Sequence, residues 1–133
     1  MRIPFIAGNW KMNKTIAEAV ALVSALRPLL EGIAGVEVAV CPPFPALEAV
    51  RRALAGSSIR LGAQNMHWEQ SGAFTGEVSP RMLTGLCDCV IIGHSERRTL
   101  FGETDETINP KMRTALKQCL KPIFCIGETL AER

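Results

Sequence analysis

The sequence predicts an α/β domain built on a parallel sheet, because short apolar segments alternate with segments of helical periodicity along all 133 residues. Five segments are almost continuously apolar and are bounded by Gly, Pro, Asn or Gln: 3–8, 36–41, 59–63, 89–93 and 122–127. Strands of parallel sheets have this pattern because helices bury both of their faces. Their first residues are 33, 23, 30 and 33 positions apart, close to the roughly 30 residues of one strand–helix–strand unit.

Helical signals fill the intervals between these strands, in the order that a strand–helix repeat requires. Apolar residues at three- and four-residue spacing predict a first helix over 16–30. Thr15 can cap its amino terminus, and Glu18 can complete a capping box. A second apolar stripe, introduced by Pro45, predicts a helix over 47–54.

Two further helices and the start of another are predicted in the second half of the chain. The pair Ser79–Pro80 is a good cap and first turn for a short helix that reaches Leu86. A stripe over 108–119, with Asn109–Pro110 at its start, predicts the fourth helix, and 128–133 predicts the opening of another. Such alternation leaves two architectures, an open doubly wound sheet or a barrel, and both bind ligands at the carboxyl ends of their strands.

Composition and charge exclude several classes of protein. Apolar residues make up 47% and charged residues 21% of the chain, which is the usage of a soluble globular domain. The net charge of +2 is too small for a nucleic-acid binder of this size. No apolar run reaches the roughly 18 residues of a membrane span, and the glycines form no dinucleotide or Walker-type phosphate motif. We therefore expect no cofactor, no nucleic acid and no membrane as partners.

The five cysteines are expected to be reduced thiols of a cytoplasmic protein. Their number is odd, none forms a Cys-x-x-Cys pair, and the amino terminus has too short an apolar stretch for a secretory signal. Cys87 and Cys89 flank Asp88, which could suggest a metal site, but only His67 and His94 could complete it. We therefore predict buried thiols and no metal.

Polar residues that suit an anionic carbonyl substrate follow the first and fourth predicted strands. Asn9 and Lys11 are two positions apart, so in extended backbone they point the same way; a turn asparagine beside a solvated lysine is the alternative. His94 follows Gly93 at the expected start of a helix, where the dipole favours a neutral imidazole that can donate to a carbonyl. A histidine that only serves the turn is the alternative. Glu96 has the right chemistry to pair with Lys11.

The segment 64–77 is predicted to be a functional loop, because loops of this length are uncommon inside a compact domain. Its two aromatic residues and two glycines indicate an ordered projection, which could dock on a partner subunit or close over a substrate. His67 within this loop is expected to be structural rather than catalytic.

Together, five motifs resemble the sequence of triosephosphate isomerase. They lie in the family's order along the chain: Gly-Asn-Trp-Lys-Met-Asn at 8–13, Gly-Ala-Gln-Asn at 62–65, Gly-Ala-Phe-Thr-Gly-Glu at 72–77, Ile-Ile-Gly-His-Ser-Glu-Arg-Arg at 91–98 and Cys-Ile-Gly-Glu at 125–128. The resemblance implies an isomerase of glycolysis and gluconeogenesis. Such enzymes interconvert dihydroxyacetone phosphate and D-glyceraldehyde 3-phosphate through an enediolate, without metal or cofactor.

The same resemblance implies a role for each matching residue. His94 is expected to be the electrophile that polarises the substrate carbonyl, and Lys11 is expected to neutralise the phosphate-bearing substrate, with Asn9 in the same pocket. Ser95 and Glu96 are expected to support this group, with Glu96 near Lys11.

The resemblance also implies a fold and partners. The family is dimeric, and its third loop reaches the active site of the second subunit, so Gln64, Asn65 and Thr75 are expected at an interface. The family fold is an eight-stranded TIM barrel of about 250 residues. The range 1–133 is expected to form one incomplete domain of it, with about five strands and four to five helices, completed by a C-terminal half or by another copy.

In the family, the catalytic carboxylate, the lid and the phosphate-binding loops follow the sixth strand, and no motif here matches them. Glu96 and Glu128 stand near strand ends, but neither occupies the motif of the base. A positioned general base is worth about 10²–10⁴ in rate, so the isolated chain is expected to be essentially inactive. The alternatives are a non-enzymatic, self-associating half-barrel module and an unrelated doubly wound protein that binds a small anion at Lys11 and His94.

Overall fold

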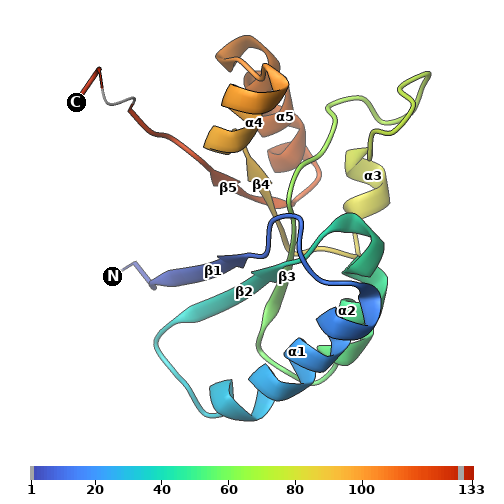
Figure 1. Cartoon of the computed structure of the whole chain (residues 1–133), viewed down its shortest axis with the longest axis vertical. Helices are drawn as coiled ribbons and strands as arrows, with labels where there is room; N and C mark the ends of the chain where they lie inside the picture. Colours follow the sequence, from blue (N-terminus) through green and yellow to red (C-terminus); the bar gives the residue numbers. More distant parts are fainter. Residues whose placement is uncertain (1, 129–130) are drawn as a thin grey trace.

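The computed structural model describes residues 2–128 and 131–133, and in them five parallel strands form one sheet whose order follows the chain (Figure 1). The strands are β1 (Phe5–Asn9), β2 (Glu37–Cys41), β3 (Arg60–Ala63), β4 (Cys89–Ile92) and β5 (Lys121–Phe124). Each lies within one or two residues of a predicted apolar segment at its start, and β5 ends three residues early, at Phe124. The α/β class with a parallel sheet is therefore confirmed.

Helical segments fill every interval between strands except part of the loop after β3. They are α1 (Ile16–Leu30), the 3-10 turn η1 (Phe44–Ala46), α2 (Leu47–Ala53), α3 (Pro80–Leu83), α4 (Ser95–Phe101) and α5 (Asp105–Lys117). Thr15 accepts a hydrogen bond from the Glu18 backbone N–H while the Glu18 carboxylate accepts from the Thr15 N–H, so the predicted capping box is confirmed.

Three predicted helix boundaries differ from the structure. The helix after Ser79 ends at Leu83 rather than Leu86, because Thr84 is already extended. Helix α5 begins at Asp105 and contains Pro110, which we placed at its start. Thr104 is its N-cap residue, and the Thr107 hydroxyl accepts a hydrogen bond from the Thr104 N–H. Of the helix predicted over 128–133, residues 129 and 130 lie outside the described residues, and the others are not helical.

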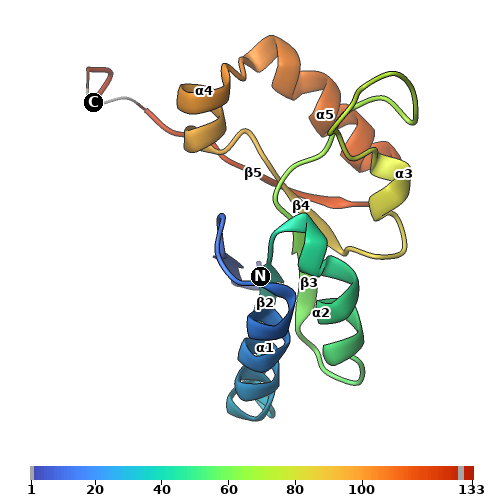
Figure 2. The same cartoon turned by 45° about the vertical axis from the view of Figure 1, so that its right-hand side comes forward.

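One face of the sheet packs against the helices and forms the hydrophobic core. Leu61 of β3 and Val90 and Ile92 of β4 are fully buried there, together with Val23 of α1 and Val50 of α2. Figure 2 shows α1 and α2 beside the first strands, and α4 and α5 beside β4 and β5. This covering explains the apolar residues that face the helices, whereas β1 and β5 also carry exposed apolar residues.

The opposite face is concave. Lys121 of β5 donates to the Glu37 carboxylate of β2 at 3.1 Å, and its ammonium lies 4.5 Å from the centre of the Phe5 ring in β1. Two strands lie between β5 and β2 and three between β5 and β1, so these side chains can meet only because the sheet curls toward them. The curl is that of a barrel wall with β1 and β5 as its edges.

The two edge strands carry exposed apolar side chains. Ile3 and Ile6 at β1 are 62% and 60% exposed, and Phe124 and Ile126 at and after β5 are 46% and 80% exposed. In Figure 1 β1 and the segment that follows β5 both lie on the left, at this open side of the curved sheet. The predicted five-stranded part of a barrel, with unpaired first and fifth strands, is therefore what the described residues form.

Candidate active site

The end of β1 turns sharply, and the turn fixes Lys11. The Asn9 side-chain oxygen accepts a hydrogen bond from the Lys11 backbone N–H at 3.0 Å. Lys11 has a positive φ of 55°, a left-handed conformation that costs a residue with a side chain roughly 1–2 kcal/mol. The extended backbone that we assumed from the two-residue spacing is therefore wrong, since the asparagine holds a tight turn instead. Such strain concentrates at functional sites.

The end of β4 presents His94 as the amino-terminal cap of α4. Gly93 has a φ of 75°, which allows the chain to turn between strand and helix. The His94 Nδ1 accepts a hydrogen bond from the Glu96 backbone N–H at 3.2 Å. This contact suits the tautomer of His94 that carries its proton on Nε2. This confirms the predicted place of His94 at a strand end and helix start, and it leaves an N–H free to donate to a carbonyl.

Glu96 and Lys11 form an ion pair between α4 and the end of β1. The Lys11 Nζ lies 2.6 Å from Oε1 of Glu96, and the two side chains are 54% and 43% exposed. The hydrogen bond from Lys11 lowers the pKa of the Glu96 carboxyl from its ordinary value. The pair, which joins residues 85 positions apart, was predicted from their chemistry alone.

The second oxygen of Glu96 lies 3.6 Å from Nδ1 of His94. That nitrogen cannot donate to the carboxylate while it accepts from the backbone N–H. The backbone contact is the shorter of the two, and 3.6 Å is beyond hydrogen-bond length. The carboxylate is therefore held by Lys11 and not by the imidazole.

Gln64 and Asn65 follow β3, and their side chains form hydrogen bonds with other residues of this chain. The Gln64 amide donates to the backbone oxygens of Lys11 and Cys41, at 2.8 Å each. The Asn65 side-chain oxygen accepts from Lys111 at 2.9 Å, and Asn65 is only 8% exposed. Both residues thus support the Lys11 turn and the base of α5, and their expected contact with another subunit stays a prediction.

The loop over 64–77 projects from the body of the protein, as Figure 1 shows beside α3. Its Thr75 is exposed, and its expected contact with another subunit stays a prediction. His67 is 8% exposed, accepts a hydrogen bond from the Glu69 N–H and stacks on Trp68 with ring centroids 4.2 Å apart. A histidine held in this way is structural, as predicted.

The predicted residues converge on one cavity of about 210 Å³ at the carboxyl ends of the strands. Asn9, Lys11, His94 and Glu96 line it, together with Gln64, Asn65, Met12, Phe44, Arg97 and Phe101. Ser95 lies in an adjoining cavity of about 370 Å³ that His94 also lines. A cation and a neutral imidazole N–H that face one small polar cavity can bind a carbonyl compound that carries a negative group.

A buried ion cluster below this cavity was missed by the sequence analysis. Glu103 accepts hydrogen bonds from Arg97 of α4 and from Lys111 of α5, and the side chains of Glu103 and Lys111 are 8% and 5% exposed. The signal that could have found it is the spacing: Lys111 lies three residues after Ile108 and four before Ala115, both on the buried stripe of α5. Charged residues on such a stripe are rarely buried without a partner.

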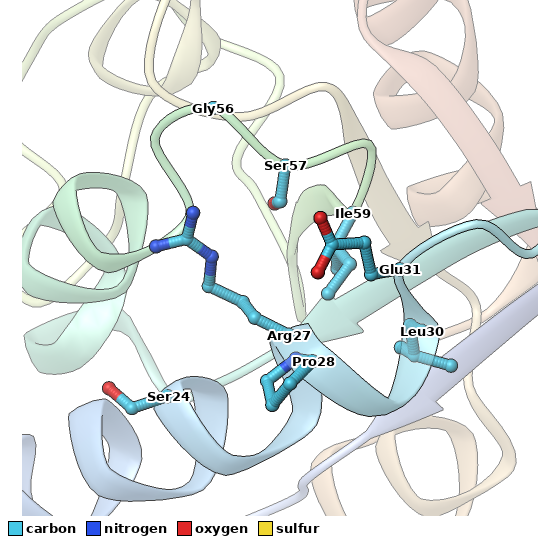
Figure 3. A pocket seen from close by; sticks show the side chains of 8 residues that line it. All are labelled: Ser24, Arg27, Pro28, Leu30, Glu31, Gly56, Ser57 and Ile59. Carbon is cyan, nitrogen blue, oxygen red and sulfur yellow. The ribbon is translucent and has the colours of Figure 1, made fainter.

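The opposite end of the molecule holds a cavity of about 360 Å³ between α1 and the loop that precedes β3 (Figure 3). Arg27 reaches across it and donates to the backbone oxygens of Ala53 and Ala55, at 3.0 Å each. Its guanidinium thereby ties α1 to the end of α2. This cavity lies at the amino ends of the strands, where barrel proteins place stabilising contacts rather than chemistry.

Comparisons with known proteins agree with this site. A sequence model described as triosephosphate isomerase matches residues 4–133. The chain is 63% identical to the triosephosphate isomerase of Carboxydothermus hydrogenoformans and 58% identical to that of Alkaliphilus metalliredigens. Each alignment covers 100% of this chain, and it covers 53% of the first relative and 54% of the second. A crystal structure of triosephosphate isomerase from Bartonella henselae superimposes with a TM-score of 0.91 at 40% identity, over 99% of this chain and 55% of that one. The chain spans about half the length of these relatives. Within the described residues, no helix is long and apolar enough to cross a membrane.

Proposed function

We propose that this chain, which belongs to the triosephosphate isomerase family, supplies the electrophilic half of an active site that interconverts dihydroxyacetone phosphate and D-glyceraldehyde 3-phosphate. The observation that carries the proposal is the hydrogen bond from the Glu96 N–H to Nδ1 of His94, at 3.2 Å. It suits the neutral tautomer that a carbonyl electrophile requires.

In the proposed reaction, the Nε2–H of His94 donates to the substrate carbonyl oxygen while the carbon-bound proton leaves. The resulting enediolate carries its negative charge on that oxygen, and His94 can move a proton between the two neighbouring oxygens. Lys11 neutralises the phosphate-bearing substrate, and Glu96 positions Lys11 through the 2.6 Å ion pair.

The carbon-bound proton needs a base that the cavity does not supply. Among its lining residues, all within the described ranges, Glu96 is the carboxylate, and Lys11 holds it ionised with a lowered pKa. A base is most effective when its pKa lies near the working pH, so Glu96 is poorly matched to this step. Since a positioned base is worth about 10²–10⁴ in rate, we expect the isolated chain to be essentially inactive.

Reconstitution tests the proposal. The chain is mixed with the C-terminal half of a family member, and isomerisation of dihydroxyacetone phosphate is followed. Restored activity that falls by at least about 10²-fold in His94→Ala is expected, because the electrophile is lost. Arg81→Gln, an exposed change on α3, is the matched control and keeps the activity. Equal activity with and without His94 would contradict the proposed role.

A second candidate is a non-enzymatic half-barrel that associates with itself. The exposed apolar side chains at the edges favour it: Ile3, Ile6, Phe124 and Ile126 form surface that association would bury. Gel filtration of the chain alone separates the candidates. A stable homo-oligomer that stays inactive after the C-terminal half is added supports the module, whereas exchange into an active complex supports the isomerase.

The partners and location follow from the same proposal. We propose a triose phosphate as substrate, a dimer in which Thr75 of the projecting loop meets a second subunit, and a cytoplasmic location. The loop supports the dimer because its tip is exposed over residues 69–77 while its base is pinned by the stacked His67.

A further inference from the structure

Two thiols meet on the concave face of the sheet, on either side of a glycine. The strand register places Asn9 opposite Cys41 and Gly62 opposite Cys89, and Gly62 lies beside Cys41 in the adjoining strand pair. Cys41 and Cys89 are both 0% exposed. They stand one strand apart on each side of β3, below the cavity that Lys11 lines.

Gly62 is the reason that the sulfurs can approach each other. A Cβ at this position would lie 2.6 Å from Sγ of Cys41 and 2.8 Å from Sγ of Cys89. Both distances are too short for a Cβ atom, so a residue with a side chain would displace the sulfurs. Both sulfurs therefore turn into the space above the glycine. The Cys89 thiol lies 3.7 Å from the Leu61 backbone oxygen.

This arrangement does not suit a disulfide. A disulfide needs Cα atoms within about 7 Å, whereas two strand spacings amount to about 9–10 Å in a flat sheet. On the concave face, the curvature of the sheet shortens the distance between the two sulfurs more than the distance between the two Cα atoms. A bridging ion spans a longer gap, because each metal–thiolate bond is about 2.3 Å long.

The surroundings restrict the kind of ion. Within residues 2–128 and 131–133, no group of three or more His, Cys, Asp or Glu side chains could hold a metal, so the pair offers two ligands only. Structural zinc requires four ligands, which excludes it here. Soft thiolate ligands select Cu(I), an ion that accepts two sulfurs in a linear arrangement.

The charged groups around the pair have both signs. Lys121 and Arg60 are the cations that act on Cys89, and Asp88 is the anion. Both cations also pair with the Glu37 carboxylate. Cys87 differs from the pair because it packs in the helix-covered core.

We propose that Cys41 and Cys89 form a two-coordinate binding site for Cu(I). Each thiol loses its proton and forms one sulfur–copper bond, so one Cu(I) binds, two protons are released and no atom changes oxidation state. The complex carries one negative charge, and Arg60 and Lys121 are the cations that act on Cys89. The site uses none of the residues assigned to isomerisation, so it stands independently of the proposed function.

Competition with a chelator tests the site. Cu(I) held by bicinchoninate is offered anaerobically at about pH 7 to the purified protein with Cys119→Ser, because Cys119 is exposed and could bridge two molecules. We expect this protein to withdraw one copper per chain. Cys41→Ser and Cys89→Ser are each expected to withdraw none, whereas Cys87→Ser, a change at another buried thiol, keeps the full uptake. Circular dichroism identifies any variant that has lost its fold.

X-ray absorption at the copper edge supplies a measurement that needs no cysteine variant at the site. Two sulfur neighbours, at a distance shorter than the roughly 2.3 Å of four-coordinate zinc thiolates, and no third ligand are expected. The proposal is overturned if the protein withdraws no copper, if uptake persists in both Cys41→Ser and Cys89→Ser, if Cys87→Ser loses it equally, or if three or more ligands surround the copper.

Discussion

Two ion clusters at the carboxyl end of the sheet use adjacent residues of α4 and differ in burial. Glu96 faces the cavity and pairs with Lys11, with side chains 43% and 54% exposed. Arg97, the next residue, also lines the cavity and pairs with Glu103, whose side chain is 8% exposed. One turn of helix therefore connects a solvated pair beside the chemistry to a buried cluster that holds the structure.

The difference lies in what each cluster contributes. Exposed ion pairs add little stability because water already solvates both charges. In the buried cluster, Glu103 accepts from Arg97 of α4 and from Lys111 of α5. Lys111 also donates to Asn65, which follows β3, so the cluster joins all three elements. Within the described residues, the second oxygen of Glu103 is buried without a hydrogen-bond partner, which leaves the cluster sensitive to any further loss. Stability and chemistry are thus separated across two neighbouring side chains.

Removal of Lys111 should have the largest effect. Lys111→Met keeps much of the side-chain volume but leaves the buried Glu103 carboxylate with Arg97 alone, and breaking a buried pair in this way costs about 3–5 kcal/mol. Urea unfolding monitored by circular dichroism measures the loss. Lys117→Met, an exposed change at the end of the same helix, is the control. Equal unfolding midpoints for the two variants would show that the cluster does not stabilise the fold.

The next largest effect should be a loss of stability in acid that depends on the buried cluster and not on an exposed ion pair. Burial alone would raise the pKa of Glu103, but the hydrogen bonds and charges of Lys111 and Arg97 outweigh it and hold the pKa below the ordinary 4.5. A carboxyl with a lowered folded pKa contributes stability that is present above its unfolded pKa and is lost as the pH falls through its folded pKa. Urea midpoints between about pH 6 and about pH 3 should therefore fall more steeply in the unaltered protein than in Glu103→Gln. Glu48→Gln, at an exposed pair with Arg52, should retain the steep fall, and parallel curves for all three would refute the argument.

The sequence predicted the strands and the exposed pair, and it missed the buried cluster, for identifiable reasons. The strands could be predicted because buried strands are composed of apolar residues, as in the fully buried β4. His94 was placed correctly because a glycine before it marks a turn. Helix α4 was predicted only as a start, since Leu100 and Phe101 at its end are 71% and 66% exposed and leave no buried stripe. The start of α5 was misplaced because Pro110, usually a helix start, lies inside this helix.

The positive φ of Lys11 could not be predicted either, because glycine and asparagine adopt that conformation far more often than lysine does. Lys11→Gly should relieve roughly 1–2 kcal/mol of strain and cost about 0.5–1 kcal/mol in unfolded-chain entropy. We expect a net gain of about 0–1.5 kcal/mol in unfolding free energy, read from urea midpoints. Lys14→Gly, at a second residue of positive φ, should give a similar gain without a change at the cavity. A clear loss of stability in Lys11→Gly alone would mean that the ion pair, and not the backbone, dominates there.

Removal of the Glu96 charge should have the smallest effect on stability and, under the proposed function, a large effect on catalysis. Glu96→Gln leaves an exposed lysine that water solvates, so the urea midpoint should match that of Glu48→Gln. In the reconstituted enzyme the same change frees the Lys11 ammonium from its position at the cavity, so kcat/KM should fall while kcat/KM of Glu48→Gln stays unchanged. A fall in the midpoint with unchanged kcat/KM would reverse the comparison, because it would make the exposed pair structural. A strained lysine, held by an asparagine on one side and a carboxylate on the other, is what a site needs when the position of a charge matters more than its stability.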